Sequence, residues 1–170
     1  MRPITAVLED PIFDVGAWLV EERRRADINE AAWLEVLAEF DRSERWLLDG
    51  QLTGADWLRW RMKMARSTAH EKLQVAHELE RRPIVKAAFA AGEICYSAVR
   101  AITRLEGVSP AVDETLVELA RRGSVLQLEQ AVRFYRLHDE QDRPIDPRGG
   151  GIPVAASTFP MASTGSGLWK

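Results

Sequence analysis

The sequence predicts an all-α fold: a multi-helix bundle of about eight helices that contains a helix-turn-helix-like unit and ends in an irregular tail. Apolar residues recur with helical spacing almost everywhere before residue 138. Residues typical of helix starts precede several of these stripes. No stretch before the tail alternates apolar and polar residues as a strand does. With 170 residues, 46% of them hydrophobic, the chain can form a domain with a core.

Helix boundaries are predicted in chain order from local residue types. Pairs with the spacing of a capping box each predict a helix start. These pairs are Asp27 with Glu30, Thr53 with Asp56, and Thr68 with Glu71. Proline suits the first turn of a helix, and glycine the position just after its end. Such residues mark the later boundaries at Pro83, Gly92, Ser109-Pro110 and Gly123-Ser124.

Two residue types that sometimes serve ligands are predicted to be structural. Trp33, Trp57 and Trp60 fall on apolar stripes, so we expect them in the core rather than in a ligand cage. Cys95 is the single cysteine, which excludes an internal disulfide and favours a reducing, cytoplasmic location. Because no histidine is near it in the sequence, a buried structural thiol is favoured over a nucleophile.

The composition divides the chain into an all-helical domain over residues 1–138 and a tail over residues 139–170. The tail is rich in Pro, Gly, Ser and Thr, and we expect it to be mostly irregular. The chain then stops without a closing element, which predicts truncation within a longer architecture.

The motifs argue against an enzyme, a metal site, a bound cofactor and a membrane protein. His70 and His77 are seven residues apart, too far for the i, i+4 pair that binds zinc on a helix. The chain contains neither the phosphate-binding motif G-x-x-x-x-G-K-S/T nor the dinucleotide-binding motif G-x-G-x-x-G. No apolar run approaches the ~20 residues needed to span a bilayer. We therefore predict no catalytic residues, no cofactor and no membrane partner.

Charge is unevenly distributed along the chain. The stretch 59–104 holds 10 Lys and Arg against 4 Asp and Glu, whereas the stretch 1–58 holds 6 against 13. A basic centre between acidic flanks is typical of a local anion-binding surface. Charge segregation that arises by accident in a helical protein is the alternative.

The basic centre contains two helices, predicted over residues 55–64 and 67–79, that have the size and order of a helix-turn-helix. In such a unit the second helix presents its outward residues to the major groove of DNA, with cations at its ends meeting phosphates. We therefore predict duplex DNA as a partner. An ordinary helical hairpin with a polar face is the alternative. The predicted DNA-binding residues are Lys63, Arg66, Ser67, His70, Gln74, His77, Arg81 and Arg82.

Three segments resemble the conserved block of the bacterial 13E12 repeat family, whose members carry the helical "domain of unknown function 222". The segments are HEKLQVAHELERRP, AAFAAGEICYSAVRAITRL and LVELARRGSVLQLEQAVRFYR. The resemblance covers roughly residues 31–136 and implies a helical domain that usually precedes a metal-dependent HNH nuclease. The sequence departs from the family at Lys63, Ala65, His70 and Gln74, and at Cys95, which is a poorer helix cap than serine.

Because there is no histidine after His138, an HNH motif is not expected in this chain. The leading prediction is a non-catalytic DNA-binding or DNA-targeting domain. The alternative is a helical protein-interaction or dimerisation module, with a homo-oligomer formed through helical surfaces.

Overall fold

The computed structural model describes residues 14–142, with side chains described up to residue 137. Within this range the chain forms seven α-helices and one short 3-10 helix, and no strand. The all-α prediction is therefore confirmed, with seven α-helices rather than about eight. In chain order the elements are α2 (Val15–Arg42), η1 (Arg45–Asp49), α3 (Gly54–Met62), α4 (Arg66–Arg81), α5 (Pro83–Ala90), α6 (Tyr96–Ile102), α7 (Pro110–Arg122) and α8 (Val125–Asp142).

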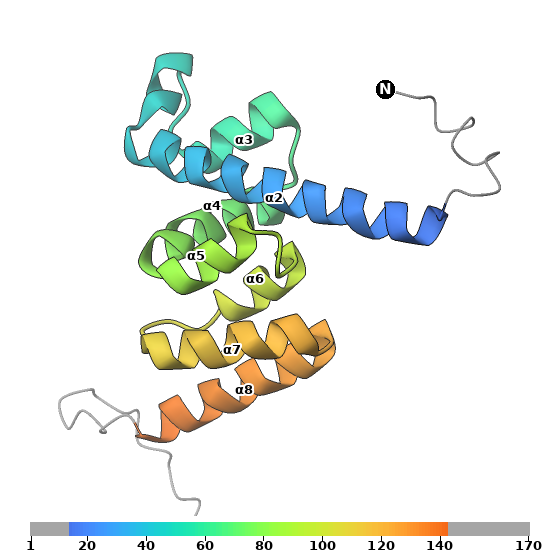
Figure 1. Cartoon of the computed structure of the whole chain (residues 1–170). Coiled ribbons are helices and arrows are strands. Elements are labelled where there is room, and N and C mark those ends of the chain that lie inside the picture. The colour runs from blue at the N-terminus through green and yellow to red at the C-terminus, as the bar shows by residue number, and fades with distance from the viewer. Residues whose placement is uncertain (1–13, 143–170) are drawn as a thin grey trace, which may run out of the picture.

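The helices stack in successive layers along the molecule (Figure 1). Helices α2 and α3 form one end, α4 and α5 lie in the middle, and the α7–α8 hairpin forms the other end, with α6 between the middle and the hairpin. One core runs through all layers. Its largest buried side chains include Leu34, Leu58, Phe89, Ile102, Leu116 and Leu128.

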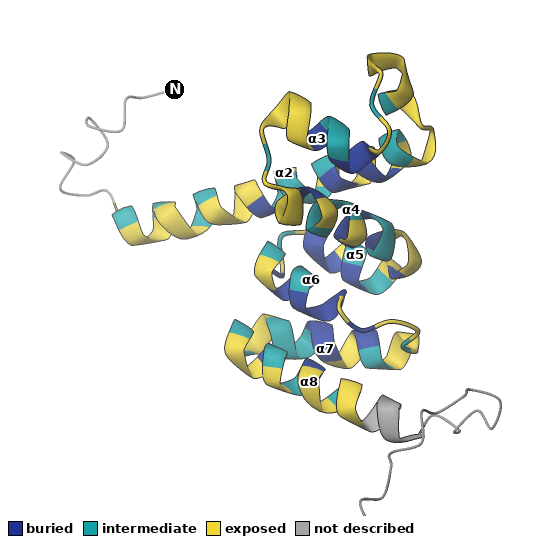
Figure 2. Ribbon diagram, turned by 180° about the vertical axis from the view of Figure 1, so that it is seen from behind, coloured by how far each residue is buried: buried dark blue, intermediate teal, exposed yellow. Residues whose placement is uncertain are grey.

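Helix α2 is longer than the sequence predicts. It begins after Asp14, whose carboxylate accepts a hydrogen bond from the Ala17 N–H at 2.9 Å, and it continues unbroken to Arg42. The predicted helix start at Asp27 is wrong, because the helix runs straight through that residue. The N-terminal half of α2 projects beyond the bundle and is largely exposed (Figure 2).

Asp27 instead caps a different helix. Its side chain is buried, and its Oδ1 accepts a hydrogen bond from the Tyr96 N–H at 2.9 Å, at the start of α6. The residue at the N-cap position of α6 is Cys95, whose side chain makes no capping bond. The carboxylate of Asp27 therefore supplies from α2 the acceptor that the first turn of α6 lacks.

The other predicted boundaries are mostly confirmed. Thr53 caps α3, and Pro83 opens α5. Gly92 follows α5 with a φ of +67°, where a Cβ would lie 2.8 Å from Cγ of Arg24, so the turn requires glycine. The predicted cap at Thr68 is wrong, because α4 begins two residues earlier at Arg66.

Two predictions about individual side chains need correction. Trp33 and Trp57 pack against the core as predicted, but Trp60 is 46% exposed and lies outside it. Cys95 is half-buried rather than buried. Helix α8 runs past the predicted domain boundary at residue 138 to Asp142, and the rest of the predicted tail, 143–170, lies outside the described residues.

Candidate nucleic-acid interface

The two helices predicted as a helix-turn-helix-like unit form a packed pair. Thr53 begins α3, and Lys63 ends it in the left-handed conformation, with a φ of 58°. Helix α4 follows after a turn of three residues. Leu58 on α3 and Ala69 on α4 are fully buried, which fixes one helix against the other. Helix α4 therefore has one face in the core and the opposite face outward.

The outward face of α4 borders a hollow that α6 completes, here called the α4–α6 groove. Ser67, His70 and Gln74, all exposed, line it from α4. Arg100 on α6 and Arg104 just beyond its end line the other side. The structure thus brings three predicted residues together with two arginines that the predicted site did not include. Their only trace in the sequence is the basic charge of the stretch 59–104.

The predicted DNA-binding residues in the C-terminal part of α4 behave differently. His77 turns towards α2, where its Nε2 lies 2.8 Å from Oδ2 of Asp41. The side chain of Arg81 is 75% exposed and pairs with Glu78 at 2.8 Å. The α4–α6 groove is therefore lined by α4 only from Ser67 to the middle of the helix, since His77 is engaged with a carboxylate of a neighbouring helix.

Arg82 does not lie on the surface, so its prediction as a phosphate contact is wrong. It is 4% exposed, and its guanidinium donates to the backbone carbonyls of Ile102 at 2.6 Å and Leu105 at 2.7 Å. Its Nη2 also lies 3.7 Å from Oδ1 of the buried Asp113. Arg82 therefore ties the α4–α5 junction to the end of α6 and to α7.

Two glutamates of α4 that could repel an anion are already neutralised. Glu71 lies 3.7 Å from Arg100 and accepts a hydrogen bond from the Tyr96 hydroxyl. The side chain of Glu78 is only 12% exposed and pairs with Arg81. Their negative charge is therefore largely compensated on the outward face of α4.

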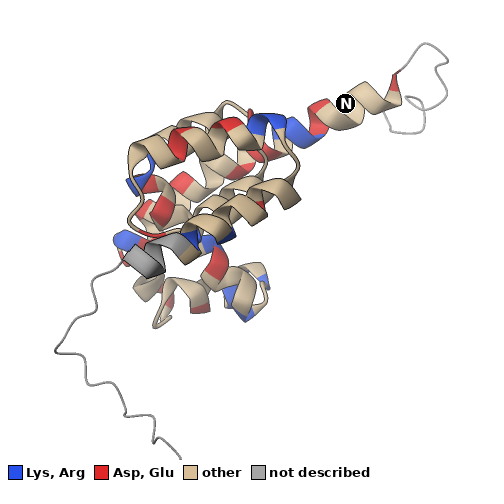
Figure 3. Cartoon of the chain, turned by 90° about the horizontal axis from the view of Figure 1, so that it is seen from below, with Lys and Arg blue, Asp and Glu red and all other residues tan. Residues whose placement is uncertain are grey.

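The cations around the start of α4 differ from most others in the fold. Lys and Arg are generally interspersed with Asp and Glu along the helices (Figure 3). Most of the Lys and Arg side chains described form ion pairs. Lys63, Arg66 and Arg104 form no close ion pair with any residue that the structure describes, although the charge of Arg66 helps to lower the pKa of Asp56. No side chain caps α4, and its first turn holds no acidic residue. These features leave the start of α4 electropositive.

A comparison with protein families shows which family this helical domain belongs to. The sequence matches the family described as "Domain of unknown function (DUF222)" over residues 17–146, which is more than half of the chain. The chain belongs to this family. The match confirms the part of the predicted resemblance that concerns the helical domain. No curated protein and no solved structure matches this chain significantly.

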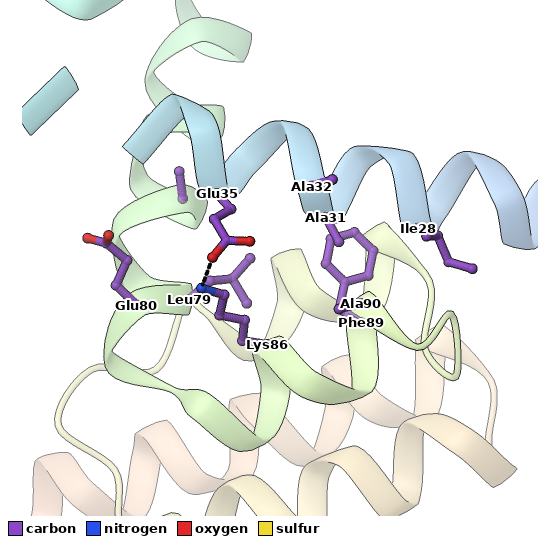
Figure 4. A pocket seen from close by; sticks show the side chains of 10 residues that line it. Ile28, Ala31, Ala32, Glu35, Leu79, Glu80, Lys86, Phe89 and Ala90 are labelled. Atoms are coloured by element: carbon purple, nitrogen blue, oxygen red, sulfur yellow. Dashed lines mark hydrogen bonds and ion pairs between the residues drawn. The ribbon is translucent and has the colours of Figure 1, made fainter. Parts of the chain in front are cut away.

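The DUF222 domain has a second hollow, on the side of α4 that faces α2 and α5 (Figure 4). It measures about 140 Å³, and much of its lining is alanine, including Ala31, Ala76 and Ala90. Lys86 and Glu35, whose side chains meet at 2.7 Å, lie beside it. None of the predicted DNA-binding residues lines this hollow.

Other kinds of site are not evident in the described part of the DUF222 domain. Among residues 14–137, no group of three or more His, Cys, Asp or Glu side chains is placed to hold a metal ion. None of the helices described is both long and apolar enough to cross a membrane. The α4–α6 groove is therefore the site on which the functional proposal rests.

The contact between Thr53 and Asp56 at the start of α3 leads to a testable prediction about the pKa of Asp56. The Thr53 hydroxyl donates to Oδ2 of Asp56 at 2.8 Å, and this bond, aided by Arg59, holds the pKa of Asp56 below its usual value. Replacing Thr53 with alanine is expected to raise that pKa. Because the pKa is lowered in the folded protein, the contribution of Asp56 to stability is lost as the pH falls through its folded-state pKa.

Carboxyl chemical shifts followed by NMR against pH measure the pKa of Asp56 directly. Thr115→Ala is the matched control, because Thr115 is an exposed threonine whose hydroxyl donates to a carbonyl within α7. An unchanged pKa of Asp56 in the Thr53→Ala variant would contradict the assignment.

Proposed function

We propose that this DUF222 domain is a non-catalytic module that binds duplex DNA through the start of α4 and the α4–α6 groove. The observation that carries the proposal is the pair Lys63 and Arg66 beside the uncapped start of α4, with Arg104 lining the α4–α6 groove opposite Ser67 and His70. Phosphate groups suit such a site, because guanidinium and ammonium groups and free backbone N–H groups all attract anions.

The polar residues of the groove support base contact beside phosphate contact. Gln74 can pair with an adenine edge, and Ser67 and His70 can donate to bases or phosphates. Ser67 and His70 lie in the N-terminal half of α4, the part of a recognition helix that enters the major groove, and Gln74 lies at its middle.

The resemblance to 13E12 repeat proteins extends the proposal to a biological role. In that family the helical domain usually precedes an HNH nuclease, so the DNA-binding domain would direct the nuclease to its substrate. The proposal assigns no cleavage to the domain itself. Metal-dependent cutting of plasmid DNA by this chain would contradict that part.

Titration of a labelled duplex, followed by fluorescence anisotropy at several salt concentrations, tests DNA binding. Binding should weaken steeply with salt, because each Lys or Arg that meets a phosphate releases counterions. The Lys63→Ala and Arg66→Ala variants should each reduce the slope of log K against log salt by about 1. Gln74→Ala should instead weaken the preference for one sequence over another.

Arg45→Ala is the matched control. Arg45 forms no ion pair within the described residues, but it belongs to η1 and not to the proposed interface. Its loss should leave the salt slope unchanged. No binding of wild-type protein at low salt would refute the proposal and favour the second candidate, a protein-interaction or dimerisation module.

One specific observation favours that second candidate. Leu47, Leu48 and Leu52 are exposed at 52%, 88% and 82%, close together in and after η1. Neighbouring exposed leucines are typical of protein–protein contact surfaces. They lie at the end of the stack that holds α2 and α3, away from the α7–α8 hairpin.

A further inference from the structure

A second basic hollow lies next to the α4–α6 groove, between the end of α6 and the helix α8. We call it the α6–α8 groove. Three arginines, Arg104, Arg133 and Arg136, line it together with one carboxylate, that of Glu129. The arginines come from segments about 30 residues apart in the chain, so no local motif joins them.

Arg104 lines both grooves, which makes them neighbours across the end of α6. Helix α6 packs directly on α8, and its side chains Tyr96 and Arg100 reach Glu71 of α4. The arginines that line the two grooves, Arg100, Arg104, Arg133 and Arg136, therefore extend from α6 to α8.

The pairing of charges sets this surface apart from the adjacent helix α7. Arg121 pairs with Glu93 and Glu118, and Arg122 pairs with Glu118. By contrast, neither Arg104 nor Arg133 forms an ion pair with a residue in the described part of the chain, and both are exposed. Positive charge that no described residue compensates is available to an external anion.

We infer that Arg104 and Arg133 form a second phosphate-contact region, which holds the backbone of the same duplex on the α8 side of the α4–α6 groove. The inference rests on the proposed DNA binding by α4. A helix in the major groove of DNA has a phosphate backbone on either side, because the major groove is only ~12 Å wide. Lys63 and Arg66 lie at the start of α4, whereas Arg104 lies across the α4–α6 groove from α4 and Arg133 lines the adjoining α6–α8 groove.

This contact is independent of DNA sequence. Guanidinium groups bind phosphate oxygens in a bidentate way, and such contacts position a protein on DNA without reading bases. The α6–α8 groove should therefore strengthen binding to every duplex equally. The polar residues of α4 should determine the preference for one DNA sequence over another.

The test compares the salt dependence of duplex binding for Arg104→Gln, Arg133→Gln and the double variant in the full chain. Each single variant should reduce the slope of log K against log salt by about 1, and the double variant by about 2. The reduction should be the same for unrelated duplexes. Arg122→Gln is the control, because its side chain is 82% exposed on α7 and lies outside both grooves. Thermal unfolding of each variant verifies that the fold is retained.

The outcomes separate this inference from the proposed function. If Lys63→Ala and Arg66→Ala reduce the slope but Arg104→Gln and Arg133→Gln do not, the second contact region is refuted and DNA binding stands. If Arg122→Gln reduces the salt slope equally, the reduction comes from the lower net charge, and the second contact region is refuted as well. If wild-type protein binds no duplex DNA, both the proposed function and this inference fail.

Discussion

Replacing Arg82 with alanine is expected to lower the free energy of unfolding by about 3–5 kcal/mol, because removing one partner leaves a buried charge uncompensated. The guanidinium makes the two short bonds to the carbonyls of Ile102 and Leu105, and it is the cation nearest to Asp113. Asp113 is itself 4% exposed, and its Oδ1 accepts no hydrogen bond. The variant would leave this carboxylate without a counter-charge.

The loss should depend on pH. Burial raises the pKa of Asp113, and the charge of Arg82 opposes that rise, so the variant raises the pKa further. A carboxyl whose pKa is higher in the folded protein than in the unfolded chain destabilises the fold when it is ionised. The destabilisation by Arg82→Ala should therefore be greatest near neutral pH and should shrink as the pH falls through the folded-state pKa of Asp113.

Urea unfolding of wild-type and variant protein at neutral and acidic pH measures this effect. Arg81→Ala is the control, because the neighbouring Arg81 forms only an exposed pair, for which a change within about 0.5 kcal/mol is expected. An Arg82→Ala protein with wild-type stability but a reduced salt slope in DNA binding would contradict the structural role and restore the phosphate contact predicted from sequence.

Replacing Asp27 with alanine should destabilise the fold by about 2–3 kcal/mol. The variant loses the cap of α6, which is the part-buried hydrogen bond from the Tyr96 N–H to the charged carboxylate, and hydrogen bonds to charged groups contribute about 1.5–3 kcal/mol. Arg23, which donates to both carboxylate oxygens, would lose its partner as well. Because the side chain of Arg23 is 62% exposed, water can compensate for most of that loss.

Two further variants isolate the cap. Asp27→Asn keeps an oxygen that can accept from Tyr96 but removes the charge, so it should cost less than alanine. Asp14→Ala removes the cap of α2 itself at an exposed site and should cost about 1 kcal/mol. If urea unfolding shows that Asp27→Ala costs no more than Asp14→Ala, the cap from α2 to α6 contributes little.

The sequence predicted features whose partners are close in the chain. Thr53 and Asp56 are three residues apart, and Pro83 and Gly92 need only their own backbone conformations. Asp27 with Glu30 fits the same capping pattern, yet the partner of Asp27 is Tyr96, 69 residues away. A local pattern cannot distinguish a carboxylate that caps its own helix from one that is buried against another helix.

The same limit applied to the candidate site. The sequence placed His70, Gln74 and His77 together on the outward side of the second helix, but the position of α2 determines that His77 meets Asp41. Arg82 looked like a cation at a helix end because nothing nearby in the sequence reports that Ile102 and Leu105 will surround it. Arg104 and Arg133 come together only through the packing of α6 on α8.

Helix α6 is held at both ends by buried charges from elsewhere in the chain, an acid at its start and a base at its end. With seven residues it is too short to persist as a helix on its own in water. Asp27 and Arg82 also match the direction of its dipole. The segment should therefore become helical late in folding, once α2 and the α4–α5 junction have docked. The element that separates the two basic grooves would then form only in a fully folded domain, so a partly folded chain would present no continuous basic surface.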